Sequence, residues 1–222
     1  MKINSTLLAV LMLFVADGSA FAQPKIKTDI TSMASYRMRV SLFDRLTEHR
    51  NIVMLGDSIT ARGEWSELTE SRSIANRGIG GDTTKGILSR LDSIIKMQPN
   101  AIFIMVGIND LAVGYRPPQI VRNYKEVVER LSGKGRKIFI QSTLYTSRQT
   151  RLHHNKYVVE INEAMRSYCE SSGKCEYIDL NEWMSSGGMI KPSNTGDGIH
   201  LTGEGYKEWA KALAPYILSI PE

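Results

Sequence analysis

Short apolar runs alternate with amphipathic stretches along most of this chain. Five runs have the length and composition of buried strands, at residues 51–55, 73–76, 101–106, 137–140 and 176–180. Between them, apolar residues recur at helical spacing, at Ile87, Leu91, Ile94 and Ile95, at Ile120, Tyr124, Val127, Val128 and Leu131, and at Val158, Ile161, Met165 and Tyr168. A last stripe comprises Tyr206, Trp209, Ala210, Leu213 and Ile217, which we interpret as core packing. Before the first strand, a short helix is predicted by Tyr36, Val40 and Phe43.

This alternation predicts the α/β fold class. Apolar strands separated by amphipathic helices favour a mostly parallel sheet with helices on both faces. Five strands favour a three-layer α/β/α sandwich of flavodoxin-like order. In such sheets the ligand crevice lies outside the carboxyl ends of the strands, so segments that follow successive strands are expected to converge there.

The length of the chain, 222 residues with 42% hydrophobic content, predicts one packed domain, at residues 51–222, after a lead-in at 23–50. Residues 1–22 have the features of a secretory signal peptide: Lys2, the apolar run Leu7 to Val15, and the small-residue site Ala20-Phe21-Ala22. A membrane anchor would need about 20 unbroken apolar residues, and Asp17 interrupts this run. We therefore expect an exported protein, periplasmic or secreted, without stable membrane insertion.

The charge of the chain does not predict a nucleic-acid partner. The formal net charge is +5, but basic residues alternate with acidic ones, as in the stretch Val121 to Arg136, which is typical of a solvated helix face. The two cysteines, Cys169 and Cys175, lack the neighbours of a zinc site, and an oxidising compartment favours a local disulfide between them over two free thiols.

A nucleophile and a base are suggested by two short segments. Ser58 follows the first predicted strand in Gly56-Asp57-Ser58-Ile59, and a serine hydroxyl attacks a carbonyl only when a neighbouring base takes its proton. His200 is the candidate base, and Asp197, three residues earlier, can hold the other ring nitrogen across a turn. Alone, Asp-x-x-His would be interpreted as a surface turn or a helix cap.

Attack by serine creates an oxyanion that needs preorganised hydrogen-bond donors. Three candidates follow successive strands: the backbone amides of Ser58 and Gly81, and the carboxamide of Asn109. The glycines near Gly81 could instead serve only a turn. Asp82 is interpreted as a helix N-cap, and Asp57 and Asp110 as groups that support the loops.

Metal-assisted hydrolysis is the alternative chemistry. Its oxygen ligands would be Asp57, Asp82, Asp110 and Asp197. That alternative leaves Ser58 and Asn109 without a role, so the prediction is a mechanism that needs neither a metal nor an organic cofactor.

From Asn51 onward the chain resembles the SGNH hydrolases, also called the GDSL esterase and lipase family. The stretch Asn76 to Thr84 resembles the branch around the platelet-activating-factor acetylhydrolase catalytic subunits and bacterial carbohydrate esterases. The resemblance implies Ser58 as nucleophile, Gly81 and Asn109 as oxyanion donors beside the Ser58 amide, and Asp197 with His200 as the rest of the triad. Ile59 stands where the family often has leucine, a change that keeps an apolar side chain.

The expected activity is that of a serine esterase acting on small-molecule or glycan esters, removing short acyl groups, acetyl foremost, through an acyl-enzyme. Two polar segments, Leu144 to Asn155 and Ser185 to Gly198, are expected to flank the cleft and to offer little apolar surface to a fatty chain. Lysophospholipase or thioesterase activity is the nearest alternative, and a catalytically silent carbohydrate-binding module is a second. The sequence predicts no oligomeric state.

Overall fold

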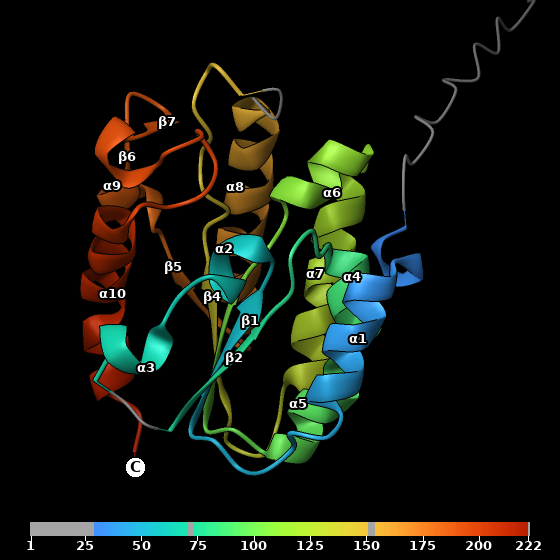
Figure 1. Ribbon diagram of the computed structural model, residues 1–222. Coiled ribbons are helices and arrows are strands. Elements are labelled where there is room, and N and C mark those ends of the chain that lie inside the picture. Colours follow the sequence, from blue (N-terminus) through green and yellow to red (C-terminus); the bar gives the residue numbers. More distant parts are fainter. Residues whose placement is uncertain (1–28, 71–72, 151–153, 222) are drawn as a thin grey trace, which may run out of the picture.

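The computed structural model describes residues 29–70, 73–150 and 154–221. Its main sheet is parallel, in the order β2-β1-β3-β4-β5 (Figure 1). The strands are β1 (Ile52–Gly56), β2 (Ile74–Gly78), β3 (Ala101–Met105), β4 (Lys137–Gln141) and β5 (Glu176–Ile178). The predicted α/β class and flavodoxin-like strand order are confirmed.

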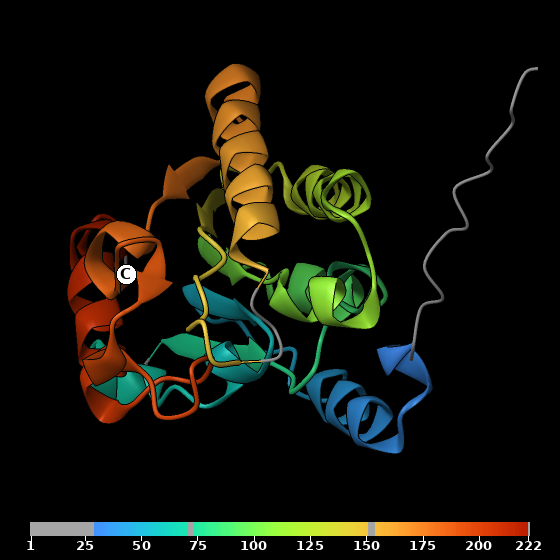
Figure 2. The same ribbon diagram turned by 90° about the horizontal axis from the view of Figure 1, so that it is seen from above.

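Helices cover both faces of the sheet, as Figure 2 shows from the edge where the strands end. One layer contains α4 (Thr84–Leu88), α5 (Leu91–Met97), α7 (Pro117–Leu131) and α8 (Asn155–Ser172), with α6 (Ile108–Val113) at its upper end. The other layer contains α3 (Trp65–Leu68), α9 (Asn181–Met184) and α10 (Gly203–Leu218). The short elements are η1 (Ile30–Ser32), α1 (Ala34–Phe43), α2 (Ser58–Ala61), β6 (Ser185–Ser186), β7 (Met189–Ile190) and η2 (Pro192–Asn194).

The alternation of side chains along each strand builds a separate core on each face. In β1, Val53 and Leu55 join the core under α4, α5, α7 and α8, while Ile52 and Met54 join the core under α10. All four side chains are at most 3% exposed, which explains why the strand is apolar without alternation. Trp209, fully buried in the second core, confirms that the C-terminal stripe serves packing.

The stripe from Ile87 to Ile95 forms two helices rather than one. The chain leaves helical geometry at Arg90, whose φ and ψ are −133° and 22°. The apolar spacing continues across the break because both short helices bury the same face, with Ile87, Leu91 and Ile94 fully buried. The interruption places the Arg90 side chain inside the protein, where it is 1% exposed.

The predicted N-terminal helix is α1, and it packs beside α4. The Tyr36 hydroxyl donates to the carbonyl of Gly86 at 2.6 Å, and the Phe43 ring lies under the guanidinium groups of Arg77 and Arg90. The predicted leader, residues 1–22, lies outside the described residues. Within the described part of the chain, none of the helices combines the length and hydropathy needed to cross a bilayer.

Cys169 and Cys175 form a disulfide, as the sequence favoured. The bridge ties the end of α8 to the residue before β5, at the amino edge of the sheet, opposite the edge where the strands end.

We expect the double substitution Cys169→Ala with Cys175→Ala to lower the free energy of unfolding by about 2 kcal/mol, because the bridge closes a loop of only about seven residues. Urea denaturation of both proteins measures the difference. Equal stability of the two proteins under oxidising conditions would contradict this prediction.

Candidate active site

The residues singled out in the sequence converge at the carboxyl edge of the sheet. Ser58 begins α2 directly after β1, Gly81 lies in the turn after β2, and Asn109 lies in α6 after β3. The loop before α10 brings Asp197 and His200 to the same edge (Figure 1). This convergence follows from parallel strands, which all end on one side.

A chain of two hydrogen bonds links Ser58, His200 and Asp197. Ser58 Oγ lies 3.0 Å from His200 Nε2, and His200 Nδ1 lies 2.7 Å from Asp197 Oδ2. Because an ionised carboxylate can only accept, the ring presents Nδ1–H to Asp197 and leaves the Nε2 lone pair for the Ser58 proton. The arrangement can therefore raise the nucleophilicity of the Ser58 hydroxyl.

Asp197 also builds the turn that carries the base. Its Oδ1 accepts from the backbone amides of Ile199 and His200 at 2.9 and 2.7 Å. Partial burial would raise the pKa of Asp197, but the hydrogen bonds from the side chain and amide of His200 outweigh that effect and lower the pKa to about 2. The carboxylate therefore stays charged near neutral pH, while the same turn fixes the imidazole.

The loop carrying His200 is anchored on both sides. Thr195 Oγ1 donates to the His200 carbonyl at 2.9 Å, and the Ser147 amide donates to the Gly198 carbonyl at 2.9 Å. Gly198 has φ +86°, and a Cβ there would meet Ser147 Oγ at 2.1 Å. Only glycine fits this close approach, which holds the loop against the segment after β4.

The three candidate oxyanion donors come from neighbouring loops. Asn109 Nδ2 donates to the Asp82 carbonyl at 3.0 Å and to Asp57 Oδ2 at 3.3 Å. Those two acceptors are the chain neighbours of Gly81 and Ser58, so the Asn109 carboxamide bridges the loops that carry the two candidate amides. Gly81 has φ +77°, a left-handed conformation that favours glycine. The roles of these donors stay predictions, but the structure brings the groups together.

The interpretation of Asp82 as a helix N-cap is wrong. Thr83 caps α4, with Oγ1 accepting from the Gly86 amide at 3.1 Å. Asp82 is fully buried and forms an ion pair with Arg90 at 2.7 Å. Asp and Thr are both preferred at helix N-caps, so the sequence alone does not decide between Asp82 and Thr83. Nothing near Asp82 in the sequence indicated that it pairs with Arg90, eight residues away.

Asp57 and Asp110 support the loops, as expected. Asp57 caps α2 by accepting from the Ile59 amide at 3.0 Å, and Asp110 accepts from Thr84 Oγ1 at 2.5 Å and from the Thr84 amide. Desolvation by burial raises the pKa of both carboxyl groups to about 7, and the charge of Asp82 adds to the rise.

The four carboxylates of the metal alternative are thus engaged by donors of the protein itself. Among the residues described, no group of three or more His, Cys, Asp or Glu side chains is placed to hold a metal ion.

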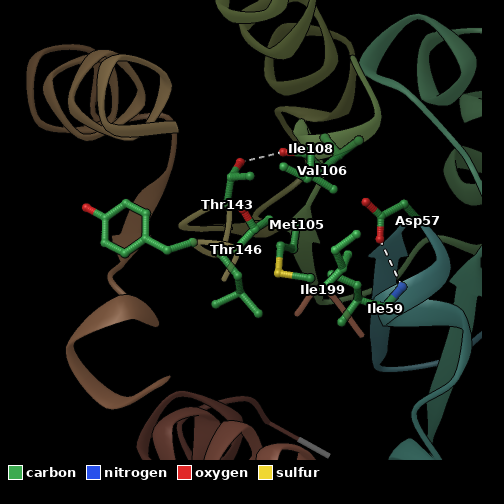
Figure 3. Close-up of a pocket in the computed structure, with 10 residues that line it drawn as sticks. Asp57, Ile59, Met105, Val106, Ile108, Thr143, Thr146 and Ile199 are labelled. Carbon is green, nitrogen blue, oxygen red and sulfur yellow. Dashed lines mark hydrogen bonds between the residues drawn. The ribbon is translucent and has the colours of Figure 1, made fainter. Parts of the chain in front are cut away.

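A small pocket lies between the chain neighbours of Ser58 and of His200, and the sequence interpretation missed most of its residues. Figure 3 shows Ile59, Met105, Val106, Ile108 and Ile199 around it. Asp57, Thr143, Leu144, Tyr145 and Thr146 complete the lining. A signal was available for two of them, because Ile59 follows the candidate nucleophile Ser58 and Ile199 precedes the candidate base His200.

Known proteins share this arrangement of elements. A model of the GDSL-like Lipase/Acylhydrolase family matches residues 54–208. The platelet-activating factor acetylhydrolase IB subunit alpha1 of Bos taurus is 23% identical over 186 residues, which are 80% of this chain and 79% of that protein. A crystal structure of a GDSL-like lipase from Bacteroides thetaiotaomicron has a TM-score of 0.69 at 19% identity, covering 82% of this chain and 97% of that one, and shows the same fold.

A second kind of relative is longer. The N-acylneuraminate cytidylyltransferase of Streptococcus agalactiae serotype V is 26% identical over 152 residues, which are 68% of this chain. The chain spans only 35% of the length of that protein, so the similarity concerns one part of it.

The raised pKa values of Asp57 and Asp110 predict a pH-dependent stability. The unfolded chain loses these two protons near pH 4 and the folded protein near pH 7, so the free energy of unfolding should fall as pH rises from 4 to 7. Each group contributes a slope of up to about 1.4 kcal/mol per pH unit. The lowered pKa of Asp197 acts below pH 4, outside this window.

We expect Asp110→Asn to flatten this slope in urea denaturation between pH 4 and 7. The control is Asp92→Asn, at a side chain that is 80% exposed. If Asp110→Asn and wild type show the same slope, Asp110 is ionised in the folded protein across this range.

Proposed function

We propose that this chain, which belongs to the GDSL-like lipase/acylhydrolase family of serine ester hydrolases, is an exported esterase that removes short acyl groups, acetyl foremost, from carbohydrate esters. The observation that carries the proposal is the linked set Ser58, His200 and Asp197, with contacts of 3.0 and 2.7 Å. No partner of another kind is needed for this chemistry, because the set holds a nucleophile, a base and an orienting carboxylate.

The geometry supports an acyl-enzyme mechanism. Ser58 Oγ attacks the ester carbonyl while His200 Nε2 takes its proton, and the charge on Asp197 stabilises the imidazolium that forms. His200 then gives the proton to the leaving alcohol oxygen as the ester bond breaks, leaving the acyl group on Ser58. Water, deprotonated by His200, attacks this acyl-enzyme and releases the carboxylic acid and free Ser58.

The developing oxyanion would be held by the amides of Ser58 and Gly81 and by Asn109 Nδ2. Asn109 already makes two hydrogen bonds, at 3.0 Å to the Asp82 carbonyl and at 3.3 Å to Asp57 Oδ2. The longer contact is the weaker one, so the hydrogen facing Asp57 is the one that can be shared with substrate. The bond to the Asp82 carbonyl keeps the amide group in place meanwhile.

The preference for short acyl groups is supported by the pocket of Figure 3. It is small and mainly apolar, and it lies between the chain neighbours of the nucleophile and of the base. The two polar segments expected to flank the cleft offer it little apolar surface: Leu144 of the segment Leu144 to Asn155 lines the pocket, and so does Ile199, one residue after the second segment. An acetyl group needs little apolar surface, whereas a fatty chain needs far more.

The acetyl part of the proposal is supported by the name of one relative, an acetylhydrolase. The carbohydrate part is supported by the name of the other, which acts on N-acylneuraminate, an acylated sugar acid. Export rests on the predicted leader at residues 1–22. Lysophospholipase or thioesterase activity is the alternative within the family, and the linked triad favours catalysis over a silent binding module.

The nucleophile is tested with p-nitrophenyl acetate. We expect Ser58→Ala and His200→Ala each to lower kcat by up to the order of 10⁶, because loss of either group disables the triad. For Asn109→Ala the expected loss of kcat is about 10² to 10³ with little change in KM. Ser66→Ala, at an exposed serine of α3, is the control. Undiminished turnover by Ser58→Ala would exclude the serine mechanism.

The acyl preference is tested with a series of p-nitrophenyl esters. We expect kcat/KM to be highest for acetate and to fall toward octanoate, and Ile199→Ala, which enlarges the pocket, to shift the preference toward butyrate. Leu218→Ala, at a side chain that is 85% exposed, should leave the series unchanged. An optimum at octanoate or longer would favour the lipase alternative. The substrate class is then decided by comparing kcat/KM for acetylated sugars with kcat/KM for lysophosphatidylcholine.

A further inference from the structure

Arg90 is a deeply buried charged group near the site, and the mechanism above does not use it. Its side chain is 1% exposed. Nε and Nη2 lie 2.8 and 2.7 Å from Asp82 Oδ2, and Nη2 also donates to the Gly56 carbonyl at 3.1 Å. One planar guanidinium therefore joins the end of β1 to the loop after β2.

Both attachment points are next to the predicted oxyanion donors. Gly56 stands two residues before Ser58, whose amide is the first donor. Asp82 directly follows Gly81, the second donor, and the Asp82 carbonyl accepts from Asn109 Nδ2, the third, at 3.0 Å. The second oxygen of the Asp82 carboxylate accepts from the Thr83 amide at 2.9 Å. The Asp82 side chain thus holds the loop after β2 in place.

Phe43 of α1 shields this ion pair from solvent. The Phe43 ring is 2% exposed, and its centroid lies 5.8 Å from Cζ of Arg90 and 4.8 Å from Cζ of Arg77. Exclusion of water strengthens the hydrogen bonds between Arg90 and Asp82 and limits their motion.

Stability alone does not account for the pair. Burying two charges costs desolvation free energy that their attraction often fails to return, and apolar residues of similar size commonly serve a core as well or better. What an apolar pair could not do is hold two loops by directional hydrogen bonds. Oxyanion donors are effective only when they are fixed before the charge develops.

We infer that Arg90 is a positioning residue that aligns the three oxyanion donors through Asp82 and Gly56. This inference rests on the proposed function, because it assigns Arg90 a role in the same reaction. Arg90 touches neither the nucleophile nor the base, so its effect should fall on the oxyanion step.

The test uses two variants of the full chain, one with a single and one with a double substitution. Arg90→Lys keeps the charge but loses the planar fork that reaches both acceptors. The double substitution Arg90→Met with Asp82→Asn removes both charges, so no buried charge is left unpaired. The matched control is Arg130→Lys. Arg130 also donates to a backbone carbonyl, that of Leu88 at 2.8 Å, and to an aspartate, Asp92 at 3.2 Å, but it lies at an exposed position of α7.

With p-nitrophenyl acetate we expect both Arg90 variants to lose about 10- to 100-fold in kcat, somewhat less than the loss of a whole donor, with KM within about twofold. The control should keep its kcat. In combination with Asn109→Ala, Arg90→Lys should lower kcat by less than the product of the two single losses, because both act on the same donor set. Circular dichroism at the assay temperature verifies folding.

Four results would overturn the inference: unchanged kcat in folded Arg90 variants, a loss confined to KM, full additivity with Asn109→Ala, or failure of both variants to fold, which would make the pair a stability element only. Failure of the proposed function is a different result, because wild type would then lack Ser58-dependent turnover of the ester.

Discussion

Ser58 and His200 are 142 residues apart in the chain, and a hydrogen bond of 3.0 Å joins them. That contact depends on the parallel sheet, because only parallel strands deliver the ends of β1, β2 and β3 to the same edge. The two apolar faces of the sheet then require helices on both sides, and the loop before α10 brings His200 to Ser58, just after the end of β1. The parallel sheet therefore determines both how the core packs and where the site residues meet.

Electrostatic balance is the second constraint on this edge. Asp57, Asp82 and Asp110 are each at most 1% exposed. Among the residues that the structure describes, Asp82 is the only one of the three that forms an ion pair. The other two carboxyl groups depend on amide and hydroxyl donors, with pKa values raised to about 7. The loops are therefore ordered by polar groups that face inward, which leaves their outer surface open to a substrate.

Much of this molecule could be predicted from residue patterns. The apolar run at residues 101–106 corresponds to β3, and the helical stripe from Ile120 to Leu131 corresponds to α7. These elements are predictable because a strand buried on both faces is continuously apolar and a helix buried on one face is apolar at helical spacing. The candidate site residues could be chosen because Ser58, Gly81 and Asn109 follow strands. Patterns failed around Arg90 and Asp82, which form a buried ion pair. The predicted helix is interrupted at Arg90 into α4 and α5, and the cap of α4 is Thr83 rather than Asp82.

The disulfide between Cys169 and Cys175 lies at the amino edge of the sheet, while the triad lies at the carboxyl edge. A change in the redox state of the surroundings would therefore alter the stability of the folded protein at a place remote from the proposed catalytic residues. The disulfide and the proposed catalytic residues lie at opposite edges of the same sheet. Selection, or an engineer, can adjust one of them while the other stays as it is.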